Sequence, residues 1–334
     1  MSNTAPKAVL YTSGVSVWGA VPQLAFIEKG YEESDYELRF VNLMEGENFA
    51  PSYLRINQNG TVPSLVVPLA ETAGQEVDTK FRALNGSIEI TEFLDASRSQ
   101  SILDIKGEDS ARPAPVLSPA TIEGKAASDA LIKMVQAPLA EPNGLLLAAR
   151  SMQELDQQRK GVQGTFCKNR QAALERFRAE AKSNTSAENP RTASVTERLV
   201  QWYNDKEASL APLHAAYLHA DQDASQKFVQ QSLQLWVGAA HVLAELEQKI
   251  LSPFVFGDQI SLADLHITAW LARIFSIATN LEGDQDEVSA LKKVLAKIEG
   301  SEEASRGLGP KVIQYWNTVK ARPSFQQVYK DGLH

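Results

Sequence analysis

The sequence Ile-Asn-Gln-Asn-Gly-Thr-Val-Pro-Ser-Leu at residues 56–65 decides the fold, because a proline here leads directly into an apolar strand. Proline lacks the N–H that a sheet ladder uses, so the start of this strand must tolerate its absence. If the Val62–Pro63 bond is cis, the tight turn exposes the N–H and C=O of Val62 at the sheet edge. An extended peptide can pair with them there. The alternative is a trans proline at an ordinary strand start.

Short apolar runs on both sides of this stretch predict a small mixed domain. The run at 36–43 alternates in the manner of a strand, with Tyr36, Leu38 and Phe40 on one face. The expected elements, in chain order, are a strand at 8–11, a helix at 21–29, strands at 36–43, 64–67 and 76–84, and a helix at 88–95. The order β-α-β, connection, β-β-α is that of thioredoxin.

The rest of the chain is predicted to be helical. Residues 97–118 are rich in Ser, Pro, Gly and charge, which predicts a linker, and residues 228–251 carry an apolar stripe that predicts a central helix. We therefore expect a thioredoxin-like domain at 1–96 and an all-α domain at 119–334, with an extension at about 150–222.

The extension is expected to be helical, to fold back on the second domain and to lie apart from the binding site. Its polar segment Asn184 to Thr192 is expected to be mobile.

Four motifs together resemble the glutathione transferase superfamily. They are Gly60 to Leu65, Gly86-Ser87-Ile88-Glu89-Ile90-Thr91-Glu92-Phe93-Leu94-Asp95, Phe256-Gly257-Asp258-Gln259-Ile260-Ser261-Leu262-Ala263-Asp264-Leu265, and the tail from Tyr315 to Phe325. In the third motif Ser261 and Asp264 have the spacing of a helix capping box, a structural role. Residues 150–222 match no family that we recognise.

The resemblance implies that the first domain holds glutathione. Thr61, Val62 and Pro63 would contact its backbone, and Ser87 would bind the γ-glutamyl carboxylate at a helix N-terminus, which attracts anions. Taken alone, Ser87 is simply a helix N-cap. Gly86 stands where the family usually has Glu or Asp, so the contact to the glutathione amino group is in doubt.

The catalytic residue implied by the resemblance is a serine after the first strand. In serine-type members it donates a hydrogen bond to the glutathione sulfur, and a helix N-terminus also favours the thiolate. Ser16 falls on this position; Ser13, Thr12 and Tyr11 are alternatives, with Ser13 also expected in the glutathione site. The alternative for Ser16 is an ordinary loop serine.

Pro22 indicates that the first helix starts near residue 20 or 21, because proline is tolerated only in a first turn. Its spacing is similar, more weakly, to that of the bacterial glutathione-dependent β-aryl etherases and their fungal relatives. Aromatic ethers or other bulky aromatic compounds are therefore candidate substrates. Trp18 is expected either to line the second-substrate pocket or to pack in the core.

Composition excludes several functions. The net charge of -8 and pI near 5.3 oppose nucleic-acid binding. No signal peptide or long apolar run is apparent, so we expect a cytoplasmic protein without a membrane partner. The single cysteine, Cys167, is expected to be inert, and the histidines lack metal-ligand spacing, so no metal is expected.

The resemblance implies a detoxifying transferase that activates the glutathione thiol for conjugation or displacement on a small apolar, aromatic electrophile, ether cleavage included. Glutathione is then the co-substrate. A non-catalytic glutathione-fold module that binds partners or carries ligands is the alternative. A homodimer is expected, with pairing altered by the extension.

Overall fold

The computed structural model describes residues 7–69, 80–98, 114–183, 190–298 and 308–334. By their contacts the residues form two compact units. The first comprises Met1–Phe40, Val62–Leu146 and Gln234–His334; the second comprises Val41–Thr61 and Leu147–Leu233.

The first unit contains a four-stranded mixed sheet in the order β2-β1-β3-β4. Its strands are β1 (Ala8–Thr12), β2 (Tyr36–Phe40), β3 (Ser64–Pro68) and β4 (Phe81–Asn85). β1 and β2 run parallel, whereas β3 is antiparallel to both β1 and β4. The predicted thioredoxin-like arrangement is confirmed. The part of the fourth predicted strand before Lys80 lies outside the described residues.

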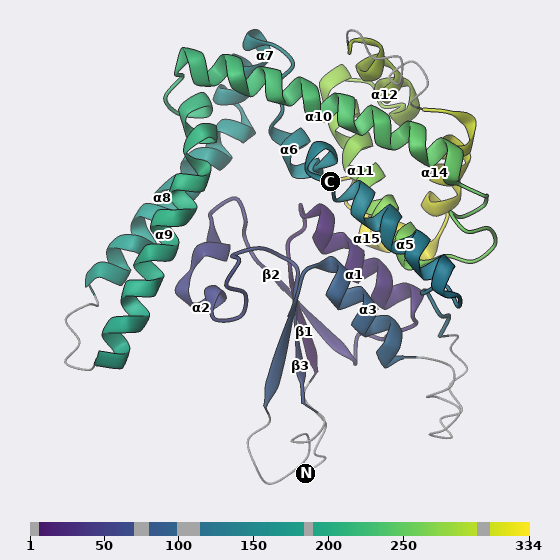
Figure 1. Ribbon diagram of the computed structural model, residues 1–334, viewed down its shortest axis with the longest axis horizontal. Helices are drawn as coiled ribbons and strands as arrows, with labels where there is room; N and C mark the ends of the chain where they lie inside the picture. The colour runs from purple at the N-terminus through teal and green to yellow at the C-terminus, as the bar shows by residue number, and fades with distance from the viewer. Residues whose placement is uncertain (1–6, 70–79, 99–113, 184–189, 299–307) are drawn as a thin grey trace. The chain divides into compact units, whose positions relative to one another are not determined.

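Two helices, α1 (Val17–Glu28) and α3 (Ser87–Ser97), lie side by side on one face of this sheet (Figure 1). α1 begins earlier than Pro22 suggested. The Ser16 side chain caps the helix by accepting a hydrogen bond from the Gly19 amide at 3.1 Å, so Pro22 sits in the helix interior. The prediction of a start near residue 20 was wrong because one missing N–H did not outweigh this cap.

The remaining helices of the first unit belong to the C-terminal half of the fold. They are α5 (Ile122–Val135), η2 (Pro138–Ala140), most of α6 (Pro142–Leu147), the second half of α10 (Gln222–Lys249), α11 (Leu262–Glu282), α12 (Glu287–Ala296), α14 (Pro310–Lys320) and α15 (Pro323–Val328). α11 packs against α1, α5 and α12 and is buried along most of its length. The sequence analysis predicted that residues 228–251 form the central helix, but α11 takes that position.

The predicted capping box at the start of α11 is confirmed. Asp264 accepts hydrogen bonds from the Ser261 amide at 2.7 Å and from the Val255 amide at 3.0 Å, while the Ser261 hydroxyl contacts both its carboxylate and its amide. Asp264 is fully buried. The box therefore fixes where the central helix begins.

A buried ion pair joins the end of α1 to the end of α3. Lys29 Nζ lies 2.9 Å from Asp95 Oδ1 and donates to the Pro115 carbonyl at 2.6 Å. Asp95 also accepts from the amides of Leu117 and Ser118. The last residues of the predicted linker are thus tied to the thioredoxin-like fold. Most of the predicted linker lies outside the described residues, and the division at 97–118 stays a prediction.

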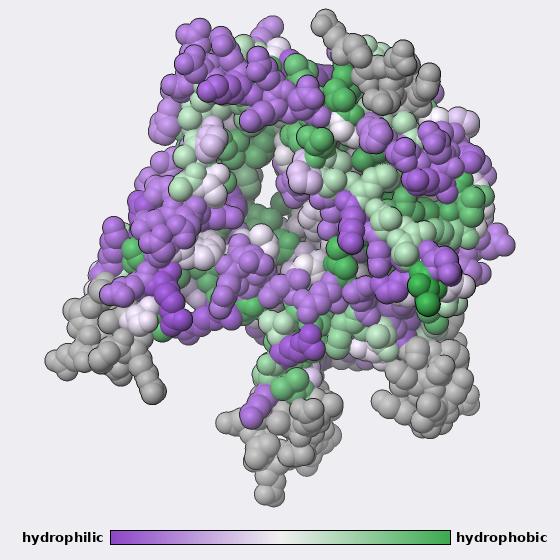
Figure 2. All heavy atoms as spheres, viewed as in Figure 1, coloured by the Kyte–Doolittle hydropathy of each residue, from purple (hydrophilic) through white to green (hydrophobic). Residues whose placement is uncertain are grey.

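The second unit is built from helices of the predicted extension and from the connection between β2 and β3. Its elements are η1 (Glu47–Phe49), α2 (Pro51–Leu54), α7 (Met152–Lys160), α8 (Val162–Ser183), α9 (Pro190–Tyr217) and the first half of α10. α8 and α9 pack along each other, and Figure 2 shows mainly hydrophilic side chains over this pair. The extension is therefore helical, as expected. Residues 184–189 of its polar segment lie outside the described residues, whereas α9 already begins at Pro190.

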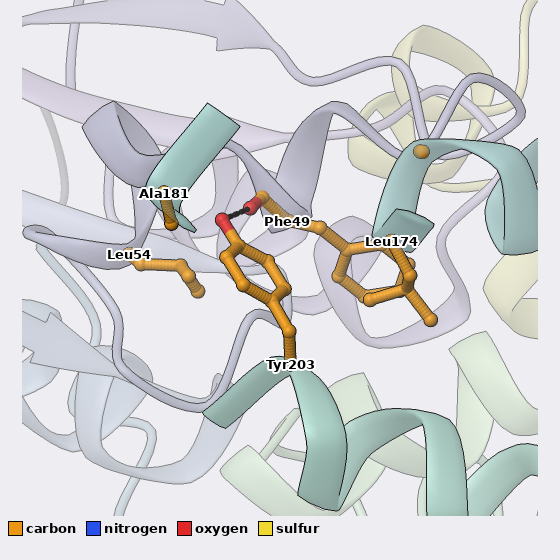
Figure 3. Packing of buried hydrophobic residues seen from close by; sticks show 6 residues of the cluster. Phe49, Leu54, Leu174, Ala181 and Tyr203 are labelled. Carbon is orange, nitrogen blue, oxygen red and sulfur yellow. Dashed lines mark hydrogen bonds between the residues drawn. The ribbon is translucent and has the colours of Figure 1, made fainter. Parts of the chain in front are cut away.

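The extension was expected to fold back on the second domain, and one part of it does, because Leu155, Cys167 and Tyr217 pack with Phe228 and Val229 of α10. Its other part packs on the connection between β2 and β3, in a cluster containing Phe49, Leu54, Leu174, Ala181 and Tyr203 (Figure 3). The Tyr203 hydroxyl donates to the Phe49 carbonyl at 2.8 Å, and Trp202 Nε1 donates to the Gln58 carbonyl at 2.7 Å. Phe49 and Leu54 belong to this connection. They provide the apolar surface against which the long helices bury their own apolar side chains.

Candidate active site

The sheet register brings three of the predicted segments together at one end of the sheet. Tyr11 is paired with Ser64, and Ser64 is paired with Asn85. The loop after β1, the turn before β3 and the start of α3 after β4 are therefore neighbours. Ser13, Ser16, Val62, Pro63, Gly86 and Ser87 lie in these segments.

The loop between β1 and α1 presents two buried serines. Ser16, 8% exposed, is the α1 N-cap, and its oxygen accepts from the Gly19 amide, so its own O–H remains a donor. Ser13 is 5% exposed, and its carbonyl accepts from the Ser16 amide at 3.0 Å. The Thr12 hydroxyl is turned inward to the Gly19 carbonyl at 3.3 Å. An acceptor near Ser16 would meet both a hydroxyl donor and a helix N-terminus.

The Val62–Pro63 peptide bond is cis, as the sequence predicts. The Pro63 carbonyl accepts from the Gly86 amide at 3.1 Å, which ties this turn to the start of α3. Within the described residues the amide and carbonyl of Val62 have no hydrogen-bond partner. They are thus available to an extended peptide.

Thr61 directly precedes Val62 in the chain. By its contacts it belongs to the second unit, where its carbonyl accepts from the Tyr53 hydroxyl at 2.6 Å and from Asn57 Nδ2 at 2.7 Å. Its role in glutathione binding stays a prediction.

Gly86 and Ser87 form the start of α3 in a way that the sequence did not anticipate. The N-cap is Gly86, with φ of 92°, a backbone region that disfavours any side chain. Ser87 is the first helical residue, so the reading of Ser87 as an N-cap was wrong. The amides of the first turn of α3 still face outward from the helix end, where they favour an anion.

The Ser87 hydroxyl lies within a buried network of three side chains. Its Oγ lies 3.2 Å from Nε2 of His266 and 3.2 Å from Nε2 of Gln136, and His266 Nδ1 lies 2.9 Å from the Leu262 carbonyl. Burial lowers the pKa of His266 to about 4, so the ring is neutral. A carbonyl only accepts, which places the ring proton on Nδ1, and Ser87 therefore donates to the bare Nε2.

Trp18 is half-buried in α1 and lies against this network. Its ring centroid is 6.3 Å from that of His266, at an angle of 42°. The contact supports the packing alternative for Trp18, and its place in a second-substrate pocket stays a prediction. His266 and Gln136 were not singled out from the sequence, because only the fold brings α11 and the end of α5 to Ser87.

A pocket of about 410 Å³ lies beside the same loop. Gly14 and Val15 line it together with α1, β2 and the C-terminal residues, and its apolar walls include Phe40, which is 64% exposed. The volume is in the range of small-molecule sites.

Cys167 lies in the second unit and is almost fully buried. Burial raises the pKa of its thiol to about 11, against a weaker opposing effect of Arg170. It is therefore protonated at neutral pH, in agreement with its predicted inertness.

Two further features of the chain bear on other functions. Across the described part of the chain, no group of three or more His, Cys, Asp or Glu side chains is placed to hold a metal ion. None of the helices in these residues is both long and apolar enough to cross a membrane.

Comparison with known proteins supports the resemblance seen in the sequence. The family model described as "Glutathione S-transferase, C-terminal domain" matches residues 212–302. No curated protein matches the sequence.

Solved structures share the fold at low sequence identity. The β-etherase LigF from Sphingobium sp. strain SYK-6 matches with a TM-score of 0.52 and 16% identity, over 98% of this chain and 100% of that one. FzlA from C. crescentus matches with a TM-score of 0.51 and 13% identity, over 98% of this chain and 93% of that one. Gtt2 from Saccharomyces cerevisiae matches with a TM-score of 0.50 and 17% identity, over 96% of this chain and 99% of that one. The chain thus has the fold of the glutathione transferases, thioredoxin-like at its N-terminus and helical beyond, and its residues 212–302 match the family model of their C-terminal domain.

Proposed function

We propose that the chain is a glutathione transferase that binds glutathione where the β1–α1 loop, the Val62–Pro63 turn and the start of α3 meet. The observation that carries this proposal is the sheet register, which makes neighbours of Tyr11, Ser64 and Asn85. Three kinds of group are then close together: a hydroxyl at a helix N-terminus, an unpaired backbone amide and carbonyl, and a second helix N-terminus.

Each group suits one part of glutathione. The Val62 backbone pairs with the cysteinyl unit, and the amides at the start of α3 receive the γ-glutamyl carboxylate. The Ser87 hydroxyl turns from His266 toward that carboxylate, while Ser13 contributes to the wall of the site. Gly86 has no carboxylate that could bind the amino group of glutathione. Ser16 donates to the sulfur and favours the thiolate.

The chemistry is nucleophilic attack by the thiolate on an apolar electrophile. Trp18 lies beside this electrophile. A carbon–sulfur bond forms as the bond to the leaving group breaks. For an aromatic ether the leaving group is a phenolate, which takes a proton from water. The shared fold of a β-etherase supports including such ethers in the first substrate panel.

The Ser16→Ala variant is expected to raise the pKa of the bound glutathione thiol by about one to two units, worth about 1.4–2.7 kcal/mol. The reason is the loss of the hydroxyl donor to the thiolate. The ultraviolet absorbance of the thiolate, titrated against pH, measures the shift. Ser16→Thr keeps the hydroxyl and the helix cap and should titrate like the wild type. If Ser13→Ala shifts the titration and Ser16→Ala does not, Ser13 is the catalytic serine.

The Ser87→Ala variant is expected to weaken glutathione binding by about 1.5–3 kcal/mol, the range for a hydrogen bond to a charged group. Calorimetry measures the dissociation constant. The His266→Phe variant removes the acceptor that competes for the Ser87 proton, so glutathione binding should stay within about threefold of the wild type. An equal loss in both variants would show that the hydroxyl acts only within the buried network.

A non-catalytic glutathione-fold module remains the second candidate, because Gly86 removes one expected glutathione contact and fold does not guarantee activity. Retention on immobilised glutathione tests binding, and the thiolate titration tests activation. Retention without a lowered thiol pKa would favour the binding module. A cytoplasmic location, a role in detoxification and a homodimer belong to the same proposal. The mass in solution, measured by light scattering, tests the dimer.

A further inference from the structure

Arg273 in the middle of α11 is a buried cation without a counter-charge. It is 1% exposed, and its Nη2 donates to the Val15 carbonyl at 2.6 Å. Its Nε and Nη1 are buried and have no hydrogen-bond partner among the described residues. Burial lowers the pKa of the guanidinium only to about 10, so it stays charged at neutral pH. An unpaired buried charge is costly, and a bound anion would remove that cost.

An acidic side chain that acts on Arg273 does not supply the missing charge. Among the described residues, Glu141 is the carboxylate whose charge raises the pKa of Arg273. Its two oxygens are engaged elsewhere, Oε1 by Asn143 Nδ2 and Oε2 by the Gly144 amide, each at 2.8 Å. The free donors of Arg273 therefore point to something that is not part of the described chain.

Two further buried polar groups near Arg273 also lack partners. They are the Tyr329 hydroxyl and Nε2 of His334, whose rings lie 4.9 Å apart. Burial raises the pKa of Tyr329 and the charge of Arg273 opposes it, whereas burial and then the charge of Arg273 both lower the pKa of His334. In His334 burial is the larger cause and brings the pKa to about 4, so the ring is neutral. Donors from α11 and from the C-terminal segment thus collect around one position.

Arg273 and Tyr329 do not line the pocket of about 410 Å³, but residues that contact them do. Val15 lines the pocket and accepts the Arg273 hydrogen bond, and His334 also lines the pocket. The apolar walls are formed by Ile27, Leu38, Phe40 and Leu333, whereas Lys330 and Asp331 contribute opposite charges that cancel. The site combines an apolar chamber with a cation behind it.

We propose that this pocket takes an apolar organic carboxylate, with its acid group held by Arg273 and Tyr329 and its body in the chamber. The His334 ring moves from Tyr329 to admit the acid group. Because Val15 directly precedes Ser16, the bound molecule lies beside the glutathione thiol and is the second substrate. This last role rests on the proposed transferase function, whereas binding of the carboxylate does not.

Calorimetry with naphthalene-2-carboxylate and its neutral isostere naphthalene-2-carboxamide, without glutathione, tests the site. The carboxylate should bind at least about tenfold more tightly, and Arg273→Met should bring its affinity down to that of the amide. Lys330→Met, which removes an exposed charge at the same pocket, should keep the preference. Equal affinities in the wild type, or a preference that survives in Arg273→Met, would overturn the proposal and leave a buried water as the partner of Arg273.

Two more variants separate binding from folding and from catalysis. If Arg273→Met does not fold, Tyr329→Phe keeps the charge and should weaken the carboxylate several-fold without affecting the amide; an unchanged carboxylate affinity would contradict the site. Ser16→Ala should leave carboxylate binding unchanged. A protein that binds the carboxylate through Arg273 but never lowers the glutathione thiol pKa would keep this site and refute the proposed transferase function.

Discussion

The Asp264→Ala variant is expected to lose about 3–9 kcal/mol of folding stability, because two buried backbone amides and one hydroxyl lose their acceptor and each unsatisfied group costs about 1–3 kcal/mol. The amides are those of Val255 and Ser261, at 3.0 and 2.7 Å from the carboxylate. The Tyr315 hydroxyl, which donates to the Asp264 carbonyl at 3.1 Å, keeps its acceptor, so the loss belongs to the side chain.

Urea denaturation followed by circular dichroism measures this effect, provided that the slope with denaturant is unchanged. Asp264→Asn is the matched control. Its amide oxygen still accepts one hydrogen bond, while its NH₂ group faces donors, so an intermediate loss is expected. A loss below about 1 kcal/mol in the alanine variant would mean that water replaces the carboxylate, and that the box does not fix the start of α11.

The Lys29→Met variant is expected to destabilise the fold by about 3–5 kcal/mol, the usual effect of removing one partner of a buried ion pair. Lys29 is 0% exposed and Asp95 7%, so solvent does not screen the pair. Asp95 would keep its hydrogen bonds from the Leu117 and Ser118 amides but would lose its counter-charge. Arg322 and Glu28 form a pair at the same end of α1, and Arg322→Met, on a side chain that is 31% exposed, is a milder control.

The pH dependence of this loss follows from Asp95. Burial acts to raise the pKa of Asp95, but hydrogen bonds from Leu117, Lys29 and Ser118 outweigh it, and the net pKa lies below the ordinary 3.8. A carboxylate with a lowered folded pKa stabilises the protein above its unfolded pKa and stops doing so as pH falls through the folded value. The difference between wild type and Lys29→Met should therefore be largest near neutral pH and shrink below about pH 4. A constant difference would exclude the ion pair as its cause.

The sequence was most informative where local chemistry decides the structure. The proline before β3, the Ser261–Asp264 spacing and the alternation at Tyr36, Leu38 and Phe40 each depend on neighbours within a few residues. Helix α1 was misplaced because proline and a capping serine compete locally, and the rule used gave proline too much weight.

Other features depend on residues that are far apart in the chain. Ser87 meets His266 across 179 positions, and Arg273 meets Val15 across 258. Neither pair has a periodic or short-range signal, so the network around Ser87 and the unpaired charge of Arg273 could be found only in three dimensions. Phe49 is a further case, because nothing in the sequence around it indicates that α8 and α9 bury it.

The packing of Phe49 against Tyr203 also has a consequence for synthesis of the chain. The two residues are 154 positions apart, so at about 5–20 residues per second Phe49 is made roughly 8–30 s before its partner. During that interval Phe49 and Leu54 lack the α8–α9 surface that covers them in the finished protein. The nascent chain therefore displays a short apolar segment that chaperones can hold until the extension has left the ribosome.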